Sequence, residues 1–254
     1  MSLSARQLAV LPAWNESATI ATVIDRVHHA LPDFDVLVID DGSNDQTASI
    51  AAAHGARVVR HPFNLGIGGA VQSGFQFALE NDYDFMVQID GDGQHDPREV
   101  AKLQDVMRQD PSVDVVCGSR FLSKDLKYPS PISRRTGIHL FAFLLSRLVE
   151  GRISDPTSGF RLYNRQAIRL FARDYPHDFP EVEAVLMCHH HRLRLRETPV
   201  RMFARGGGSS SLSGSGKSAY YMVKVLLALF IGLARRRPVP EPGGPPAVSA
   251  QHAL

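Results

Sequence analysis

Short apolar runs that end in a polar cluster, each followed by a helical stretch, recur through the first half of this sequence. The apolar runs cover residues 8–13, 35–39, 56–60, 85–89 and 113–117. Helices are expected between them, at about 18–30, 48–53, 70–79 and 98–108. A crossover helix is what joins two parallel strands. The alternation therefore predicts an α/β fold with a doubly wound, mostly parallel sheet flanked by helices.

Size and composition favour one main domain. With 254 residues, of which 44% are hydrophobic and 21% charged, the chain can bury a sizeable core but is short for two full domains. The net charge of +2 is too small to indicate a nucleic-acid partner. Cys117 and Cys188 are too few for a disulfide framework and lack a metal-ligand spacing. No charged-then-apolar leader is visible, so we expect a cytoplasmic protein.

The C-terminal part of the chain differs in composition from the rest. We expect the main domain to cover residues 1–215, an apolar helix to cover 216–237, and a disordered tail rich in Pro, Gly and Ala to cover 238–254. The most apolar run, 220–234, has 15 residues, fewer than the roughly 20 that span a bilayer. Paired tyrosines at one end and three arginines at the other favour a helix on a membrane surface. A buried core helix is the alternative.

Polar clusters follow three of the predicted strands. Asn15 and Glu16 follow the first strand, Asp40 and Asp41 follow the second, and the Asp-Gly-Asp turn at 90–92 follows the fourth. Ligands of open α/β sheets bind beyond the carboxyl ends of the strands. We therefore expect the three clusters to converge on one site.

Asp90 and Asp92 are separated by one glycine, so a turn can aim both carboxylates at one point. Hard oxygen donors of this kind suit Mg²⁺ or Mn²⁺, which leave other coordination positions to water and to substrate phosphates. The pair thus predicts a metal site that holds a diphosphate. The alternative is a polar turn in which an aspartate caps the helix near Pro97.

Other stretches carry weaker signals. The glycine-rich turn at 64–69 does not continue into a dinucleotide motif, because Val71 stands where the third glycine is needed. Arg120 and Arg134 are candidates for contacting an anionic substrate, or are solvated surface residues. The Cys-His-His-His run at 188–191 favours a solvated helix face over a metal site, since consecutive residues on a helix point in different directions.

In this order, the motifs resemble those of the inverting family 2 glycosyltransferases with the GT-A fold. The nearest branch is that of the dolichol-phosphate mannose synthase-like and bacterial polyprenyl-phosphate glycosyltransferases. The resemblance covers about residues 8–237. It is carried by PAWNE at 12–16, DDGS at 40–43, NLG at 64–66, DGDGQH at 90–95, GSR at 118–120, DPTSGFR at 155–161 and RGGGSS at 205–210.

The resemblance implies a nucleotide-diphosphate sugar as donor and a metal-dependent transfer with inversion. The residues that it implies for donor binding are Pro12, Ala13, Asn15, Glu16, Asp41, Asn64, Asp90, Gln94 and Arg205. The metal, Mg²⁺ or Mn²⁺, would be held by Asp90, Asp92 and Gln94. The acceptor would be bound by Arg120, Arg134 and Ser210, and the catalytic residues would be Asp92, Asp155 and Arg120.

The resemblance also implies an acceptor and a location. A polyprenyl phosphate is the expected acceptor, used by an enzyme peripherally associated with the inner face of the cell membrane. A lipid phosphate is already ionised, whereas a sugar hydroxyl would need a base, for which Asp155, Glu181 and Glu183 are candidates. Ser211 stands where mannose synthases tend to have lysine, so the donor need not be GDP-mannose. The oligomeric state stays open, with a homo-oligomer as one alternative.

Two rival functions are weighed against this one. Nucleotidyltransferases also combine a doubly wound sheet with an acid-held metal, but they need a basic, glycine-rich signature near the first strand. This chain has the acidic segment 12–16 there. A membrane-tethered binding module would keep the fold without catalysis, and the intact Asp90 and Asp92 argue against it.

Overall fold

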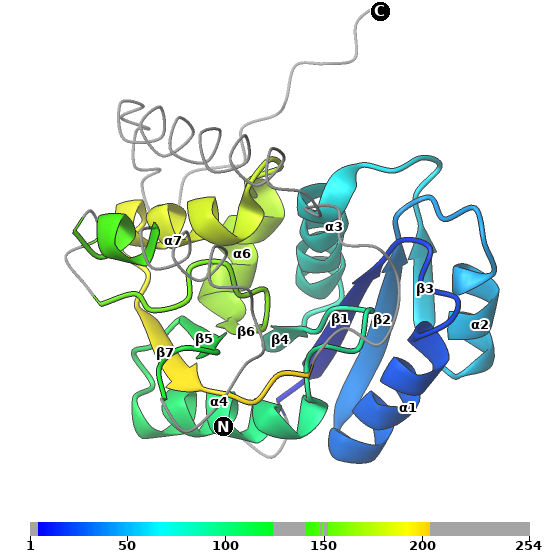
Figure 1. Ribbon diagram of the computed structural model, residues 1–254, viewed down its shortest axis with the longest axis horizontal. Helices are drawn as coiled ribbons and strands as arrows, with labels where there is room; N and C mark the ends of the chain where they lie inside the picture. The colour runs from blue at the N-terminus through cyan, green and yellow to red at the C-terminus, as the bar shows by residue number, and fades with distance from the viewer. Residues whose placement is uncertain (1–4, 124–140, 148, 150–151, 204–254) are drawn as a thin grey trace, which may run out of the picture.

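The computed structural model describes residues 5–123, 141–147, 149 and 152–203. They form a seven-stranded sheet with helices on both faces (Figure 1). The strands are β1 (Gln7–Ala13), β2 (Phe34–Asp40), β3 (Arg57–Arg60), β4 (Phe85–Gln88), β5 (Val115–Ser119), β6 (Arg161–Asn164) and β7 (Leu195–Pro199). The helices are α1 (Ile20–Ala30), α2 (Thr47–Ala53), α3 (Gly66–Glu80), the 3₁₀ turn η1 (Pro97–Glu99), α4 (Val100–Gln109), α6 (Arg165–Arg173) and α7 (Pro180–His190). Residues 141–147 are also helical.

The strand order is β3-β2-β1-β4-β6-β5-β7. β1 pairs in parallel with β2 and β4, β2 with β3, and β5 with β7. The predicted doubly wound, mostly parallel sheet is therefore confirmed. β6 is the exception, because it runs antiparallel to both of its neighbours. The apolar pattern did not predict this strand, which has only four residues and carries Arg161 at one end and Asn164 at the other.

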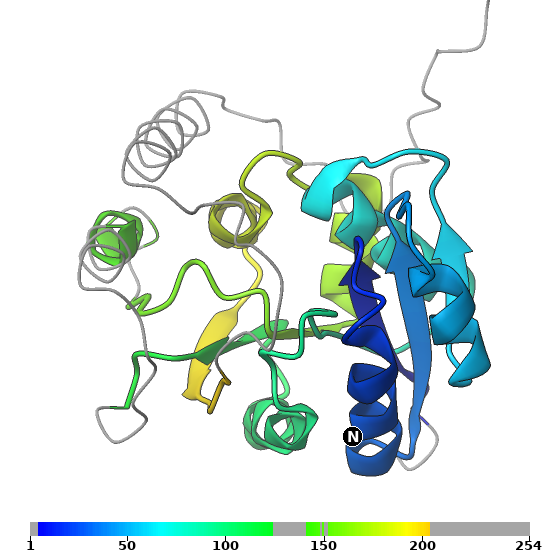
Figure 2. The same cartoon turned by 45° about the vertical axis from the view of Figure 1, so that its right-hand side comes forward.

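Alternate residues of the central strand face two separate cores. Ala9 and Leu11 of β1 pack on the side of α1 and α4, whereas Leu8 and Val10 pack on the side of α3 and α6. Figure 2 shows α4 (green) and α7 (dark yellow) on opposite sides of the strands that lie between them. This two-sided burial explains why the first strand is apolar without interruption.

Helix α3 begins earlier than its apolar pattern predicts. The stretch 64–69 was expected to be a turn, but α3 starts at Gly66, which takes a left-handed φ of +84°. The helix also lies unusually close to the sheet, since a Cβ added at Gly74 would stand 2.5 Å from Cγ1 of Val10. Glycine at position 74 thus permits the close contact between α3 and β1.

Several expected features lie outside the described residues. They are the main-domain boundary at 215, the apolar helix at 216–237, the tail at 238–254, and the side chains of Arg134, Arg205, Ser210 and Ser211. Among the residues that the structure does describe, no helix combines the length and the apolar character needed to cross a membrane.

Candidate functional site

The three polar clusters lie together at the carboxyl ends of β2, β1 and β4, which are neighbours in the sheet (Figure 1). The loop after β1 is bound to the loop after β2, because Asn15 N–H donates to Ser43 Oγ and Asn15 Oδ1 accepts from Asn44 N–H, each at 2.9 Å. It is also bound to the turn after β4, where Thr19 Oγ1 donates to the Gly91 carbonyl at 2.9 Å. The predicted convergence of the three clusters is present in the structure.

Asp45 adds a charged link between the first two loops. Its carboxylate accepts from Ser17 N–H at 3.1 Å and from Thr47 N–H at 2.9 Å. A small loss of hydration would raise the pKa of the exposed Asp45, but the hydrogen bonds from Thr47 and Ser17 outweigh it and lower this pKa to about 2. Asp45 is therefore ionised at neutral pH and holds the loops together.

Pro12 and Ala13 are buried at the end of β1, and their carbonyl oxygens are engaged. Gly91 N–H donates to the Pro12 carbonyl at 3.3 Å, and Asp41 N–H donates to the Ala13 carbonyl at 2.9 Å. Trp14, the next residue, is 53% exposed. Pro12 and Ala13 thus shape the floor of the site, while the residues after them reach into solvent.

Asp41 is buried and accepts three hydrogen bonds. Its donors are Leu65 N–H at 2.9 Å, Gly66 N–H at 2.8 Å and His61 Nδ1 at 2.7 Å. The first two donors are main-chain N–H groups at the start of α3. The first N–H groups of a helix have no hydrogen-bond partner within the helix. The carboxylate therefore anchors the glycine-rich start of α3 to the end of β2, and this anchor explains the early start of the helix.

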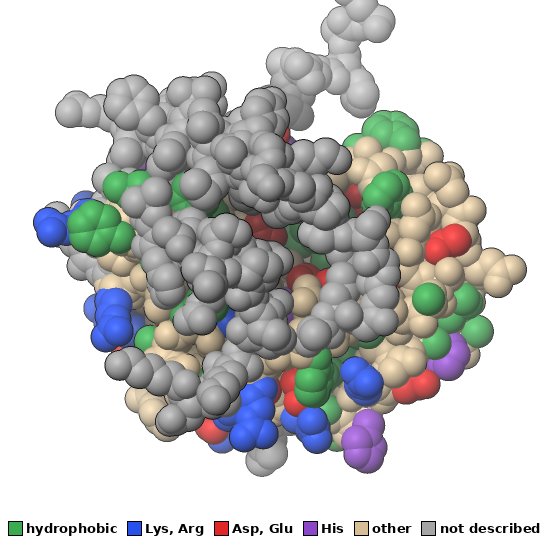
Figure 3. All heavy atoms as spheres, viewed as in Figure 1, with side chains coloured by type: hydrophobic (Ala, Val, Ile, Leu, Met, Phe, Trp, Pro, Cys, Tyr) green, Lys and Arg blue, Asp and Glu red, His purple; other side chains and the backbone are tan. Residues whose placement is uncertain are grey.

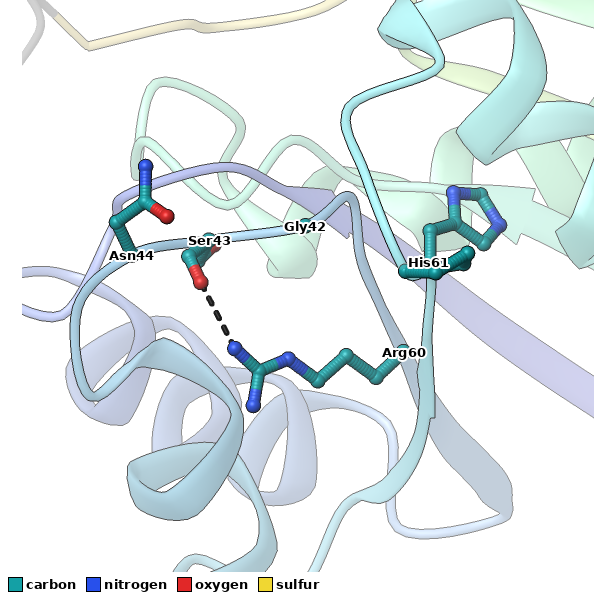
Figure 4. Close-up of a pocket in the computed structure, with 6 residues that line it drawn as sticks. Gly42, Ser43, Asn44, Arg60 and His61 are labelled. Carbon is teal, nitrogen blue, oxygen red and sulfur yellow. Dashed lines mark hydrogen bonds between the residues drawn. The ribbon is translucent and has the colours of Figure 1, made fainter.

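Arg60 lines a cavity of about 360 Å³ between the ends of β2 and β3, and it pairs with the buried Asp40. Asp40 Oδ2 lies 3.1 Å from Arg60 Nε, and Arg60 Nη2 donates to the Ser43 carbonyl at 2.9 Å. Figure 4 shows the Arg60 side chain extending toward Ser43. The imidazole of His61 points away from both of these residues. The cavity is lined by Gly42, Ser43, Asn44, Arg60, His61 and Pro62.

Asp90 and Asp92 lie in the turn directly after β4. Asp90 is 34% exposed, and its main-chain N–H donates to His95 Nδ1 at 3.0 Å. Asp92 Oδ1 accepts from Gln94 N–H at 3.0 Å, which closes a local turn. The helix near Pro97 is capped by Asp96, whose carboxylate accepts from Arg98 N–H. The capping alternative therefore applies to Asp96 and not to Asp90 or Asp92.

Arg120 and Asp155, the predicted catalytic and acceptor-side residues, contact each other. Arg120 Nε lies 2.7 Å from Asp155 Oδ2, and Arg120 Nη2 lies 2.7 Å from Asp155 Oδ1. Arg120 Nη2 also donates to Thr157 Oγ1 at 2.8 Å. On β7, Glu197 Oε1 accepts from Asp155 N–H at 2.9 Å. These contacts fix the loop of residues 155–159 that leads into β6.

This loop lies against the turn after β4. A Cβ added at Gly159 would stand 3.4 Å from Asp90 Oδ1 and 2.9 Å from Gln88 Nε2. The two acidic motifs, at 90–92 and at 155–159, therefore share one site. Figure 3 shows acidic side chains (red) near the centre of this face of the molecule.

Comparison with known proteins agrees with this geometry. The glycosyl transferase family 2 model matches residues 9–171, which is more than half of the chain. The chain belongs to glycosyl transferase family 2. This membership makes it a glycosyltransferase, and the nucleotidyltransferase rival is excluded.

Two relatives of this glycosyltransferase match more than four fifths of its length. A polyprenol monophosphomannose synthase of Mycolicibacterium smegmatis is 30% identical over 83% of this chain and 82% of its own. An undecaprenyl-phosphate mannosyltransferase of Micrococcus luteus is 31% identical over 82% of this chain and 88% of its own.

Solved structures share the fold. A glucosyl-3-phosphoglycerate synthase from Mycobacterium tuberculosis, in complex with Mn²⁺, uridine diphosphate and glucosyl-3-phosphoglycerate, has a TM-score of 0.68 at 22% identity. The match covers 91% of this chain and 81% of that one. The expected GT-A type of fold is confirmed.

The side chains of the glycosyltransferase at 90–92 fit a divalent metal. They present carboxylate oxygens, the donors that Mg²⁺ and Mn²⁺ prefer. Across the described ranges, no group of three or more His, Cys, Asp and Glu side chains is gathered closely enough to enclose an ion. Two carboxylates, with Gln94 beside them, would leave coordination positions for phosphate oxygens and water.

Gln94 and Asn64, two further residues expected to bind the donor, lie at different places along the site. Gln94 contacts Phe203, since Phe203 N–H donates to the Gln94 carbonyl at 2.8 Å. The chain that leads toward Arg205 and Ser210 thus departs from beside the acidic turn. Asn64 is exposed at the start of α3, where its Oδ1 accepts from Gly66 N–H at 3.0 Å.

Glu181 and Arg161 meet beside the 155–159 loop. Removal from water raises the pKa of the Glu181 carboxyl. Arg161 is buried in β6 and donates to main-chain carbonyls, from Nε to Ser158 at 2.9 Å and from Nη2 to Glu181 at 2.7 Å. Arg161 thereby joins the loop to the start of α7.

The sequence pattern missed three residues that hold the site. His61 binds Asp41, Glu197 binds the loop at Asp155, and Arg161 joins that loop to α7. Each acts on a partner that is distant in the chain. The strands that carry or precede them gave no signal, because β3, β6 and β7 each carry other polar residues and do not single these three out. In the run at 188–191, Cys188 is buried, while His189 and His190 are exposed.

Proposed function

We propose that this glycosyltransferase moves a sugar from a nucleoside-diphosphate donor to a polyprenyl phosphate, with inversion and with Mg²⁺ or Mn²⁺. The observation that carries the proposal is the position of Asp90 and Asp92. They stand between the loops after β1 and β2 on one side and the Arg120–Asp155 loop on the other. The names of the two relatives, a polyprenol monophosphomannose synthase and an undecaprenyl-phosphate mannosyltransferase, support a lipid-phosphate acceptor.

The donor would lie across the ends of β1, β2 and β4. Its nucleoside would rest on the loop of Asn15 and Glu16, beside the exposed Trp14. Asn64, at the start of α3, would contact the same nucleoside. The diphosphate would then reach the turn at 90–92, where a metal held by Asp90, Asp92 and Gln94 would offset the repulsion between carboxylates and phosphates.

The transfer itself is a displacement at the anomeric carbon. An ionised phosphate oxygen of the acceptor forms the new bond to this carbon, on the face opposite the leaving group. The bond to the nucleoside diphosphate breaks and its electron pair leaves with the diphosphate, so the configuration inverts. When bound, the metal supplies positive charge against the charge of the leaving group.

A lipid-phosphate acceptor agrees with the state of Asp155. Both oxygens of this carboxylate are engaged by Arg120, and the side chain is inaccessible to solvent. A carboxylate held in this way is poorly placed to take a proton from an acceptor. A phosphate acceptor that is already ionised has no proton for Asp155 to remove. In this reading Arg120 and Asp155 order the loop at 155–159.

A sugar hydroxyl is the second candidate acceptor, and Glu181 is the observation that favours it. This carboxyl is half-buried at the start of α7, and its pKa is raised by removal from water. A raised pKa brings a carboxylate closer to the range in which it acts as a general base. Glu183, in the same first turn of α7, would be the other candidate.

The donor is tested by thermal shift with Mn²⁺ and each of UDP-, GDP- and dTDP-sugars. Ligand that binds only the folded state at 100 times its dissociation constant adds about 2.7 kcal/mol of stability, which is readily measured. We expect one nucleotide to stabilise the protein in the presence of the metal and to lose that effect in EDTA. No stabilisation by any of the three would contradict the proposal.

We further propose that the segment 216–237 attaches the enzyme peripherally to the inner face of the cell membrane. The support is its apolar run and the three arginines that follow, each worth about 1 kcal/mol near anionic lipid. Flotation with phosphatidylserine vesicles should carry the full chain, and not a chain truncated before Ser218. Equal flotation of both would place lipid contact elsewhere.

A further inference from the structure

Asp41, His61 and Ser73 form a chain of hydrogen bonds, in which Asp41 and His61 are buried and Ser73 is half-buried. His61 Nδ1 lies 2.7 Å from Asp41 Oδ1, and His61 Nε2 lies 2.9 Å from Ser73 Oγ. The exposed fractions of the Asp41 and His61 side chains are 5% and 8%. A carboxylate can only accept, so Nδ1 carries the proton. In the neutral ring Nε2 then accepts from the Ser73 hydroxyl, and both ring nitrogens are satisfied.

This arrangement fixes how the Asp41 carboxylate is turned. One oxygen accepts from both His61 and Leu65 N–H, and the other accepts from Gly66 N–H. Rotation of the carboxylate would break all three contacts. The other ring nitrogen of the imidazole is bound by Ser73, which lies in α3 about one helical turn after Gly69.

The order Ser-His-Asp also occurs in hydrolytic triads, but the position of Ser73 does not suit that chemistry. Ser73 lies in the body of α3, where main-chain N–H groups are used within the helix. They cannot serve as the oxyanion donors that such a site needs. The hydrogen-bonded chain therefore serves the position of Asp41 and not a nucleophile at Ser73.

We propose that His61 is a positioning residue for the nucleotide donor. By holding Asp41, it keeps residues 64–66 in the conformation that receives the donor. This inference rests on the proposed function, in which Asn64 and the start of α3 lie against the nucleotide. It goes beyond that function by assigning a role to His61, whose imidazole points away from Ser43 and Arg60 (Figure 4).

The test compares His61→Asn with His61→Gln in the full chain. The amide nitrogen of asparagine can replace Nδ1 and donate to Asp41, whereas the longer glutamine places its amide near Nε2. Affinities for UDP, GDP and dTDP with Mn²⁺ are measured by calorimetry. For the nucleotide that binds the wild type, we expect His61→Asn to stay within about threefold. His61→Gln should weaken binding by about tenfold or more, as expected for a lost hydrogen bond to a charged group.

His54→Ala is the matched control, because His54 also binds a carboxylate, Asp25 at 2.8 Å, but on the exposed surface. It should leave nucleotide affinity unchanged. In transfer assays, His61→Gln should raise the KM for the donor and leave kcat nearly unchanged. Amide exchange at Leu65 and Gly66 should be faster in His61→Gln than in His61→Asn.

Equal affinity and equal amide exchange in the two His61 variants would overturn the inference while leaving the proposed function in place. Absence of nucleotide binding by the wild type would overturn both. If His61→Gln raised KM without changing exchange at residues 65 and 66, the route through Asp41 would be wrong.

Discussion

Arg120 and Asp155 form a buried, two-pronged ion pair that joins the end of β5 to the loop before β6. Both contacts measure 2.7 Å, and the side chains are 8% and 0% exposed. The planar guanidinium matches the two carboxylate oxygens, so each charge is neutralised where water cannot reach it. The pair holds the 155–159 loop, which contacts Asp90 through Gly159.

Arg120→Ala should lower the free energy of unfolding by about 3–5 kcal/mol, because it leaves the Asp155 carboxylate buried without its cation. Urea denaturation measures the loss. The control is Arg108→Ala, which breaks an ion pair with Asp105 whose side chains are about half exposed. That variant should lose less than about 1 kcal/mol. Similar small losses in both variants would mean that Asp155 is hydrated.

Asp92→Asn should reduce metal-dependent transfer by about 100-fold or more, since it removes a charge that helps to hold the metal on the diphosphate. The circular dichroism spectrum and the melting temperature should stay close to those of the wild type. Asp96→Asn is the control from the same segment, because Asp96 caps η1 and pairs with Arg98. Wild-type turnover by Asp92→Asn would remove this residue from the metal site.

Gly74→Ala tests the close contact between α3 and β1. The added methyl would stand 2.5 Å from Cγ1 of the buried Val10. Overpacking costs about 1–3 kcal/mol, and at so short a distance we expect it to exceed the gain in helix propensity of about 1 kcal/mol. Urea denaturation should show a net loss of stability. In a Val10→Ala background, Gly74→Ala should instead raise the stability. If Gly74→Ala stabilised the otherwise unchanged protein, α3 would lie farther from β1 than the structure shows.

The ionisation of Asp45 should make the stability of the fold depend on pH. Its pKa is lowered to about 2 in the folded protein, against about 3.9 in an unfolded chain. A lowered pKa means that the ionised group stabilises the fold above about pH 4, and that this contribution disappears as the pH falls toward 2. Asp45→Asn should thus be less stable than the wild type at pH 5 and nearly equal to it at pH 2.

The Asp45 comparison uses urea midpoints at both pH values, with Asp33→Asn as the control on an exposed aspartate. The contribution is modest, because Asp45 is itself exposed and water screens its charge. A difference between wild type and Asp45→Asn that persists unchanged at pH 2 would contradict the assignment.

The alternation of apolar runs and helices was enough to predict a mostly parallel sheet and the meeting of the three clusters, although not β6. Parallel strands end at the same edge, so Asn15, Asp41 and Asp90 had to lie near one another once the strands were placed. The Asp-x-Asp spacing likewise predicted the pair of carboxylates after β4. These features depend on local pattern and on a general rule of topology.

Other features depend on partners that are distant in the chain and could not be predicted from pattern. The start of α3 is set by Asp41, whose oxygens bind Leu65 and Gly66. β6 is short and polar at both ends, and it is held by pairing with β4 and β5 on either side. Arg120 was expected to meet an acceptor phosphate, whereas its partners in the structure include Asp155, which is 35 residues away.

The most direct test of the account is transfer of a labelled sugar to undecaprenyl phosphate, with Mn²⁺ and with EDTA, beside the same assay on undecaprenol. The donor is the nucleotide sugar that stabilises the protein in the thermal-shift screen. We predict label in the lipid fraction only when both the phosphate and the metal are present. Equal labelling of undecaprenol, or full transfer in excess EDTA, would contradict a metal-dependent transfer to a lipid phosphate.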